Sequence, residues 1–442
     1  MSFEKESLSI LHEALDRLEE GFKELPAHEA DMDMAGLRRV MLDVAEKMQD
    51  NYPYHHPLYA GQMLKPPHAI ARLAYMLAMW INPNNHALDG GRASSAMEKE
   101  AVADIAGMFG WETHLGHLCG GGTIANMEAL WVSGKLHPDQ KIVASEQAHY
   151  THSRLSDVLQ LPFQAIPCDA RARMDLNALE DALKKEDVGT VVATLGTTAA
   201  GAVDPLADIL GLKEKYNFRI HADAAYGGYF ILADNLAAET RRAFDRISEV
   251  DSIVVDPHKH GLQPYGCGCV VFKDPSVGRF YKHDSPYTYF SSEDLHLGEI
   301  SLECSRAGAS AVALWATMRM FPLEWGGKFA KGLTDGRNAA ISLFEKIQES
   351  AQFLTAFRPE LDILVWAPLA GKASEISKRS KEIFKSAARQ NLHLAVANFP
   401  KSLLQSHWDI DWDQEQVACL RACLMKPEHL EWVEQIDRLL MG

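Results

Sequence analysis

The chain has 442 residues, of which 47% are hydrophobic and 24% are charged, a composition typical of a soluble globular enzyme. Its formal net charge of −16 argues against binding to nucleic acid or to an acidic membrane surface, because both need basic patches. No run of about 18 apolar residues is present, so we expect no membrane span. The length is sufficient for a large domain and a smaller one.

The composition also constrains the compartment and the metal content. The N-terminal residues are charged and include no apolar stretch typical of a signal peptide. The seven cysteines are scattered and odd in number, which favours a reducing, cytoplasmic environment. Cys267 and Cys269 are too close together for a usual zinc pair, so we expect no metal site.

The first 50 residues place apolar side chains at spacings of three and four, the period of amphipathic helices. These helices also carry many charges, so we expect an arm that packs on another surface, for example on a second subunit. The residues that define the period are Leu8, Leu11, Leu15, Leu18, Leu37, Val40, Met41 and Val44.

Residues 51–68 combine prolines, tyrosines and histidines in an irregular segment. Such a loop can line a functional site or serve as a rigid connector, and the residues leave both readings open. A helix is expected over 69–81. Further on, Ser94 or Ser95 is expected to cap a helix over 96–109, because a serine hydroxyl can accept a hydrogen bond from the first helical turn.

The segment from Cys119 to Trp131 places three glycines directly before a helix that is expected to start at Thr123. Glycine lets a ligand approach the backbone closely, and the free N–H groups of a first helical turn bind anions. The segment is therefore a candidate phosphate-binding cup. It lacks the Gly-Lys-Ser/Thr ending of a nucleotide P-loop and the spaced glycines of a dinucleotide fingerprint. A plain glycine-rich turn explains these residues equally well.

Four buried strands follow, and a helix over 204–216 separates two of them. Alternation of strands and helices predicts parallel pairing with right-handed crossovers. A further strand over 268–273 is expected at the end of the sheet, in either direction. The four strands are expected over 141–146, 190–195, 219–225 and 252–255.

Polar residues stand where three of these strands end: His149, Asp223 and Lys259. In open α/β sheets this edge is where ligands bind. Asp223 lies in an apolar strand end, where a carboxylate needs a cationic partner, and Lys259 is the candidate. The alternative is that Asp223 caps the following turn. A lysine in apolar surroundings is a candidate nucleophile towards an aldehyde, whereas the alternative is a surface lysine in a loop.

A polar, aromatic loop over 279–294 has the length of a mobile lid, and a helix is expected over 309–320. Beyond residue 320 the pattern changes to an α+β arrangement. We therefore expect an N-terminal helical arm and loop over 1–75, a large domain over 76–320 and a small domain over 321–442. The last part is expected to contain helices 327–350, 373–390 and 427–441 and strands 362–366, 392–397 and 416–424.

The order of the glycine cup, His149, Asp223 and Lys259 is that of a pyridoxal phosphate site. The cup would take the phosphate, and the lysine amine would hold the aldehyde as a Schiff base. The carboxylate would keep the pyridine nitrogen protonated, so that the ring can accept electrons, and the imidazole would stack on the ring. Each feature alone has a plain structural explanation, but four in order at one sheet edge favour this cofactor.

At the segments Ser145–His149, Ala193–Thr198, His221–Tyr226 and Asp256–Lys259 the chain resembles the group II pyridoxal-phosphate-dependent amino-acid decarboxylases. This family includes the aromatic-amino-acid, glutamate and histidine decarboxylases, and the resemblance extends over about residues 50–320. It implies an α/β large domain of fold type I (aminotransferase-like) with a mostly parallel sheet, and a smaller α+β C-terminal domain. It also implies a homodimer with its sites at the interface, and decarboxylation of an L-amino acid to the amine and CO2.

The resemblance also implies a role for individual residues. Lys259 would bear pyridoxal 5'-phosphate, Asp223 would face the pyridine nitrogen, and His149 would stack on the ring. A tyrosine of the loop, Tyr289 in preference to Tyr287, would return a proton to Cα. The residues implied near the phosphate are Gly122, Thr123 and His258, and those implied beside the ring are Thr198 and Ala225.

The substrate is where the chain departs from the aromatic decarboxylases. The regions that carry aromatic or apolar side chains in those enzymes here contain Gln62, Lys65, Asn84 and His86. Polar groups in a pocket need polar partners, which favours a polar or acidic substrate side chain. The alternative is that Lys65 points to solvent, and an aromatic substrate remains open.

Two other functions are compatible with parts of the pattern. The same fold hosts carbon–carbon lyases and aldehyde synthases that use the same cofactor. A retro-aldol lyase would need a further phosphate or long-chain site, for which the sequence has no basic cluster. A non-catalytic scaffold would be expected to lack Lys259, Asp223 or His149, and all three are present.

Overall fold

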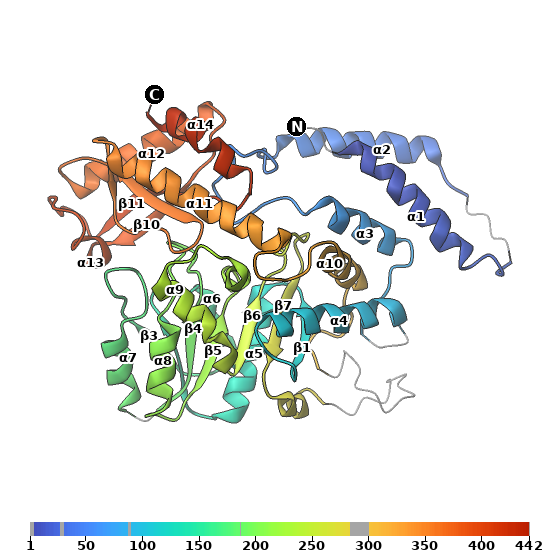
Figure 1. Cartoon of the computed structure of the whole chain (residues 1–442), viewed down its shortest axis with the longest axis horizontal. Coiled ribbons are helices and arrows are strands. Elements are labelled where there is room, and N and C mark those ends of the chain that lie inside the picture. The colour runs from blue at the N-terminus through green and yellow to red at the C-terminus, as the bar shows by residue number, and fades with distance from the viewer. Residues whose placement is uncertain (1–3, 27–30, 87–89, 186, 283–299, 442) are drawn as a thin grey trace.

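The computed structural model describes residues 4–26, 31–86, 90–185, 187–282 and 300–441. Within these ranges the chain forms two β-sheets with helices packed around them (Figure 1). The first sheet has seven strands, and the second has four strands that all come from the C-terminal part of the chain. The prediction of an α/β fold with a smaller C-terminal sheet unit is confirmed.

The seven-stranded sheet has the order β1-β7-β6-β5-β4-β2-β3. The strands from β2 to β6 pair in parallel, whereas β7 pairs antiparallel with both β6 and β1. The direction that the sequence left open for the last strand is therefore antiparallel. The strands are β1 (Leu115–Cys119), β2 (Lys141–Ser145), β3 (Phe163–Ile166), β4 (Val188–Thr194), β5 (Arg219–Asp223), β6 (Ser252–Val255) and β7 (Gly268–Phe272).

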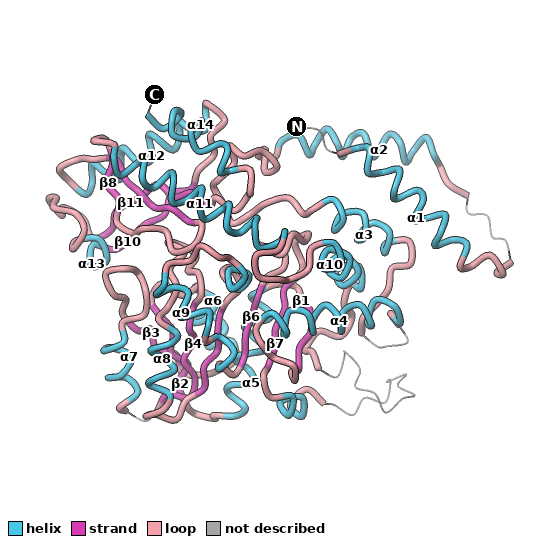
Figure 2. Tube along the Cα trace, in the orientation of Figure 1, coloured by secondary structure: helices cyan, strands magenta, loops and turns pink. Residues whose placement is uncertain are grey.

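Helices cover both faces of this sheet (Figure 2), and strands β4 and β6 near its centre are buried along their whole length. On β4, Val191 belongs to an apolar cluster that includes residues of α4, α7, α8, α9 and α10, whereas Val192 belongs to a second cluster with residues of α5 and α6. Successive side chains of a strand point to opposite faces, which explains the continuous apolar runs. Among the described residues, no helix is long and apolar enough to cross a membrane. The α-helices of this part are α3 (Ala69–Met79), α4 (Arg92–Met108), α5 (Gly122–Leu136), α6 (Thr151–Val158), α7 (Leu176–Leu183), α8 (Leu206–Lys213), α9 (Ala238–Asp245) and α10 (Gly308–Met320).

The second sheet is antiparallel throughout, with the order β10-β11-β9-β8. On β9, Trp366 packs towards α11 and α14, and its neighbour Val365 packs towards α12 and α13. The second sheet therefore has its own two apolar clusters. Its elements are β8 (Phe353–Thr355), β9 (Ile363–Pro368), β10 (Ala395–Pro400), β11 (Gln416–Cys423), α11 (Lys328–Glu349), α12 (Ala373–Arg389), α13 (Lys401–Leu404) and α14 (His429–Met441).

The N-terminal arm consists of α1 (Leu8–Glu20) and α2 (Met34–Lys47), which extend beyond the two sheets (Figure 1). Leu11 of α1 is buried, whereas α2 contains no buried residue. The apolar stripe predicted from the sequence is present, and most of it is exposed. Its exposed members on α2 are Leu37, Val40, Met41 and Val44.

The start of α4 differs from the prediction. The helix begins at Arg92 with Gly91 as its N-cap, so the expectation that Ser94 or Ser95 caps a helix from residue 96 is wrong. Both serines are buried within the first turn. The Ser94 hydroxyl donates to Asn85 Oδ1 at 2.5 Å and lies 3.1 Å from the Gly91 carbonyl, so it ties the helix to the preceding loop instead of capping it.

Candidate active site

A cavity of about 300 Å³ opens where β4, β5 and β6 end and α5 begins. It lies at the carboxyl edge of the sheet, where ligands of α/β proteins bind. All the residues predicted to hold a cofactor line it: Gly122, Thr123, His149, Thr198, Asp223, Ala225, His258 and Lys259. The cavity is also lined by Gly120, Gly121, Ile124, Asn126, Thr151, Thr194, Gly196, Tyr226 and Asp256.

The glycine cup forms one wall of the cavity. Gly121 is the N-cap of α5 and has a φ of 141°, a conformation that favours glycine. A Cβ atom on Gly121 would lie 3.0 Å from His258 Cε1, and one on Gly122 would lie 2.7 Å from Asp256 Oδ2. Any residue larger than glycine would therefore clash with these side chains. With glycine at both positions, the backbone N–H groups at the start of α5 stay accessible and can bind an anion.

Lys259 follows β6, and its Nζ lies 3.2 Å from Asp256 Oδ2. Asp256 is buried, and its Oδ1 has no hydrogen-bond partner among the described residues. The prediction that apolar groups surround this lysine is therefore wrong, because a carboxylate from the same turn contacts its amine. The lysine keeps partial exposure towards the cavity, as a nucleophile must.

Asp223 ends β5 and is 5% exposed. Its Oδ2 accepts a hydrogen bond from His152 Nε2 at 2.7 Å, so its close partner is a histidine and not Lys259, as the sequence had suggested. Burial alone would raise the pKa of Asp223, but the hydrogen bond and charge of His152, together with the charge of Lys259, lower this pKa below its usual value. The group is therefore a stable anion in the wall of the cavity.

A second buried histidine supports the same wall. His221 Nε2 lies 2.8 Å from Asn126 Oδ1, and its Nδ1 lies 2.8 Å from Ser252 Oγ. Burial lowers the pKa of His221 to about 3, so the ring is neutral and serves as a structural link. It connects β5 and β6 to Asn126 of α5, which lines the cavity.

His149 lines the cavity from the segment that joins β2 to α6. Its Nδ1 lies 2.9 Å from Thr151 Oγ1, which fixes the ring on one side. Burial lowers the pKa of His149, and the charge of Asp223, which raises this pKa, only partly offsets the effect, so the imidazole is predominantly neutral at pH 7. A neutral flat ring in this place can cover the face of an aromatic ligand.

The residues predicted to contact substrate do not line this cavity. Gln62 is exposed. Lys65 is partly buried and donates to the Met425 carbonyl at 3.3 Å, and burial lowers its pKa to about 8. The Nδ1 atom of His86 lies 3.1 Å from the Cys304 carbonyl oxygen. Their roles remain predictions, as does that of Tyr289, which lies with Tyr287 outside the described residues.

Several residues of the site were not predicted. His152 lies in the first turn of α6, three residues after His149, and no local signal in the sequence assigns it to Asp223. Asp256 was interpreted only as part of a strand end. The contact between Tyr226 and the second sheet, through a 2.6 Å hydrogen bond to Asp362, has no local sequence signal because the two residues are far apart in the chain.

Comparison with known proteins agrees with this geometry. The model of the pyridoxal-dependent decarboxylase conserved domain matches residues 126–366, more than half of the chain. The chain belongs to the pyridoxal-dependent decarboxylases. The match includes His149, Asp223 and Lys259, and it begins just after the glycine cup.

Among the relatives of this decarboxylase family member is the L-tyrosine decarboxylase of Enterococcus faecium, at 30% identity, with 70% of this chain and 66% of that protein covered. Another is a probable L-tyrosine/L-aspartate decarboxylase of Methanococcus maripaludis, at 25% identity, with 74% and 84% covered. The chain spans less than two thirds of the L-tyrosine decarboxylases of Enterococcus faecium and Levilactobacillus brevis, with 66% and 62% of their lengths covered.

Solved structures of decarboxylases share the fold. Mouse CSAD superposes with a TM-score of 0.78 at 18% identity, with 96% of this chain and 91% of that chain covered. Oryza sativa TDC with PLP and tryptamine also gives a TM-score of 0.78, at 17% identity, with both chains fully covered at 100%. At these identities the comparison establishes the fold.

The residues of the cavity fit the cofactor of the family, pyridoxal phosphate. The cup and His258 would hold its phosphate, Lys259 would bond to its aldehyde, and Asp223 would pair with its ring nitrogen. The fit rests on the space that only glycine leaves at positions 121 and 122 and on the buried anion at Asp223. When bound, the cofactor supplies a ring that accepts the electrons of a bond broken at Cα.

Proposed function

We propose that this protein removes the α-carboxylate of an L-amino acid as CO2 and releases the amine. The observation that carries the proposal is one cavity that groups a lysine, a buried anionic carboxylate and a glycine cup, within a domain of the decarboxylase family. The chemistry needs each of them, because the cofactor must be bonded, kept electron-accepting and held by its phosphate.

The proposed roles of the residues follow from their positions. Asp223 stays ionised and so keeps a proton on the ring nitrogen, and His152 orients the carboxylate through the 2.7 Å hydrogen bond. Asp256 lies 3.2 Å from Lys259 Nζ, a distance at which it can orient the amine and exchange a proton with that nitrogen. His149 covers the ring and excludes water from one face.

The substrate is unassigned in this proposal, with polar or acidic and aromatic amino acids as the two classes to separate. The names of the relatives contain both tyrosine and aspartate. The preference for a polar or acidic side chain rests on Gln62, Lys65, Asn84 and His86. Lys65 contributes less than the sequence suggested, because its amine donates to the Met425 carbonyl.

The test is incubation of the cofactor-loaded protein with a panel of L-amino acids that includes tyrosine, aspartate and glutamate. CO2 and the amine are measured together, and aldehyde and hydrogen peroxide are measured in the same samples. Equal amounts of CO2 and amine from one amino acid are the expected result. CO2 with aldehyde and hydrogen peroxide in place of the amine would contradict release of the amine and favour the aldehyde synthase. No CO2 from any member despite bound cofactor would contradict decarboxylation and favour the lyase.

We also infer a homodimer with the sites at its interface, because the apolar side chains of α2 are exposed in the single chain. A second copy would cover them. Sedimentation should give about twice the chain mass of 49.1 kDa, and deletion of residues 1–50 should lower the mass or weaken the association. A monomer at micromolar concentration would contradict the inference.

We infer the division of the chain at 1–75, 76–320 and 321–442, since the seven-stranded sheet ends with β7 and the four-stranded sheet begins with β8. Limited proteolysis with mass spectrometry tests the boundaries, and cleavage inside either sheet before the joining segments would contradict them.

A cytoplasmic location is supported by the seven cysteines, all of which lie among the described residues and are free.

A further inference from the structure

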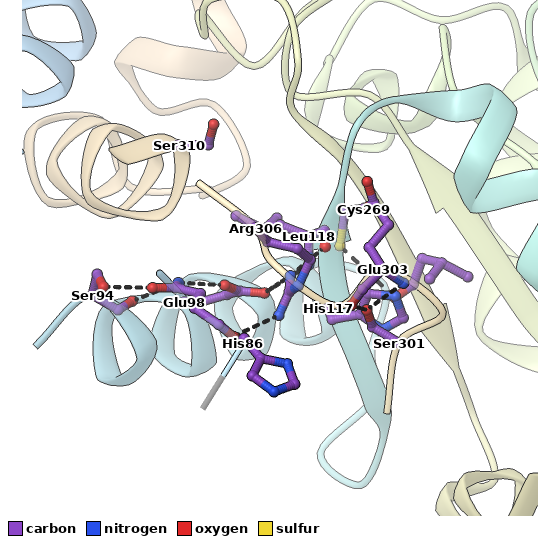
Figure 3. A network of polar contacts seen from close by, with 12 residues as sticks. His86, Ser94, Glu98, His117, Leu118, Cys269, Ser301, Glu303, Arg306 and Ser310 are labelled. Atoms are coloured by element: carbon purple, nitrogen blue, oxygen red, sulfur yellow. Dashed lines mark hydrogen bonds and ion pairs between the residues drawn. The ribbon is translucent and has the colours of Figure 1, made fainter. Parts of the chain in front are cut away.

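The glycine cup follows directly from β1, which lies at an edge of the seven-stranded sheet. Leu118 is the last but one residue of this strand, and it is buried. Its N–H donates to Glu98 Oε1 at 3.0 Å, and its C=O accepts from Arg306 Nη1 at 2.5 Å (Figure 3). Two side chains thus take the place of a neighbouring strand, because buried backbone groups need partners.

These two side chains form a buried ion pair. Arg306 Nη1 lies 2.6 Å from Glu98 Oε1, and the two residues are 9% and 1% exposed. Asn85 completes the network. Its side-chain Nδ2 donates to Glu98 Oε2 at 2.6 Å, and its backbone carbonyl accepts from Arg306 Nη2 at 3.3 Å. A buried ion pair contributes little to stability by itself, so the geometry that it imposes on its neighbours is the more informative property.

The geometry imposed here is the path of the chain into the cup. Only Cys119 separates Leu118 from Gly120. On the side of β7 there is no free space, because a Cβ on Gly268 would lie 2.5 Å from Gly121 Cα. The cup is therefore bordered by β7 on one side, and the ion pair fixes the strand end that leads into it. The segment that carries Arg306 also reaches the cup directly, through Glu303 Oε2, which accepts from the Gly120 N–H at 3.2 Å.

We propose that Arg306 and Glu98 are positioning residues for the cofactor phosphate, an inference that rests on the cofactor site proposed above. Neither residue lines the cavity. Their charges cancel, so they do not attract an anion by net charge, and they act through the backbone of Leu118. By fixing this backbone they set the direction of the N–H groups from Gly121 to Thr123, on which binding of the phosphate depends.

The test compares a ligand that carries the phosphate with one that lacks it. Apoprotein is titrated with pyridoxal phosphate and, separately, with pyridoxal, and the absorbance of the bound ligand gives each Kd. For Arg306→Gln we expect the Kd for pyridoxal phosphate to rise by at least about tenfold. The Kd for pyridoxal should change by less than about twofold, because pyridoxal makes no contact with the cup.

The matched control is Arg337→Gln. Arg337 is 8% exposed and donates from Nε to the Glu360 carbonyl at 2.8 Å and from Nη1 to the Asn235 carbonyl, far from the cup in the chain. Both arginine variants should lose thermal stability, but only Arg306→Gln should discriminate between the two ligands. Glu98→Gln keeps an acceptor for Leu118 and should give a smaller change in the same direction, and it is the variant to use if Arg306→Gln does not fold.

Equal losses of affinity for both ligands, or no loss for either, in Arg306→Gln and Glu98→Gln would overturn the positioning role. The wild-type protein separates this failure from failure of the proposed function. If the wild type binds pyridoxal phosphate and the variants bind it equally well, only the role of the ion pair is wrong. If the wild type does not bind pyridoxal phosphate, the cofactor site itself is wrong, and the positioning role falls with it.

Discussion

Two buried polar clusters lie close to each other in this molecule, and they differ in what surrounds them. The cavity cluster consists of His152, Asp223, Asp256 and Lys259, and three of these four residues line a space of about 300 Å³. The junction cluster consists of Lys65, Tyr226, His260 and Asp362, where the first sheet meets the second.

In the junction cluster polar groups of the two sheets contact one another. Tyr226 donates to Asp362 Oδ1 at 2.6 Å, and His260 Nε2 lies 3.4 Å from Asp362 Oδ2. Burial raises the pKa of Asp362 to about 6 and lowers that of Lys65 to about 8. Strong pKa shifts therefore occur in both clusters. Three residues of the cavity cluster line the open space, whereas Tyr226 alone of the junction cluster reaches it, and this difference separates a candidate active site from a structural network.

Lys259→Ala should show the largest effect and so separates the two clusters most clearly. Without its amine the cofactor loses its covalent attachment, and we expect decarboxylation to fall by at least about 10³-fold. The absorbance of the bound cofactor should change as well. Lys273→Ala, which removes an exposed lysine at the end of β7, is the control and should leave both readings unchanged. Full activity of Lys259→Ala would contradict the assignment of this cavity as the active site.

Asp223→Asn should have the next largest effect. The variant keeps the shape of the side chain but removes the negative charge, so the ring nitrogen loses its partner and kcat should fall by about 10²-fold or more. Asp204→Asn is the matched control, because Asp204 is also fully buried and accepts backbone hydrogen bonds from Met174 and Thr194. Asp204→Asn should lower stability and leave kcat unchanged, and equal losses of kcat in both variants would contradict a special role for Asp223.

His152→Leu should have a smaller effect that depends on pH. The hydrogen bond and the charge of His152 are the main causes that lower the pKa of Asp223 against the effect of burial. Without them Asp223 takes up a proton at higher pH, so the acidic limb of the rate profile should move to higher pH. His152→Gln retains a donor and should restore much of the profile, which separates positioning from general destabilisation. Identical profiles for wild type and His152→Leu would contradict the link.

The sequence predicted the parallel strands and the polar residues at their ends, because apolar runs and strand-end residues are local signals. It did not predict which polar groups meet. The sequence pairs Asp223 with Lys259, which follows the next strand, whereas the structure pairs it with His152 from the helix after β2. Contacts between elements depend on how helices pack on the sheet, and no spacing in the sequence reports this.

The same limit explains Lys65. Lys65 lies where aromatic decarboxylases carry aromatic or apolar side chains, and it therefore favoured a polar substrate. In the structure its amine donates to the Met425 carbonyl, 360 positions further along the chain. Short strands were missed for a different reason. β2, β5 and β6 are equally short and were predicted, but β1 and β3 lack a continuous apolar run, because Gly116 and His117 interrupt β1 and Gln164 interrupts β3. The edge strand β1 is also the one held by the Arg306–Glu98 pair, whose members are far apart in the sequence.

The junction cluster gives the smallest effect, and it appears in stability instead of in catalysis. Asp362 keeps its proton up to about pH 6 in the folded chain, whereas an unfolded aspartate loses it near pH 4. Between these values the folded state binds more protons, so the free energy of unfolding contributed by this group falls as the pH rises from about 4 to about 6. In Asp362→Asn this fall should be smaller by roughly 2 kcal/mol.

Urea unfolding at several pH values measures this difference. Asparagine keeps an acceptor for the Tyr226 hydroxyl, so the comparison reports the titration of Asp362 more than the loss of a hydrogen bond. Asp234→Asn, at an exposed position, is the control. If wild type and Asp362→Asn lose stability equally between about pH 4 and 6, the proton on Asp362 does not stabilise the folded state. The junction cluster would then be a set of contacts without a titrating member, and the pKa shifts of functional importance would be confined to the cavity cluster.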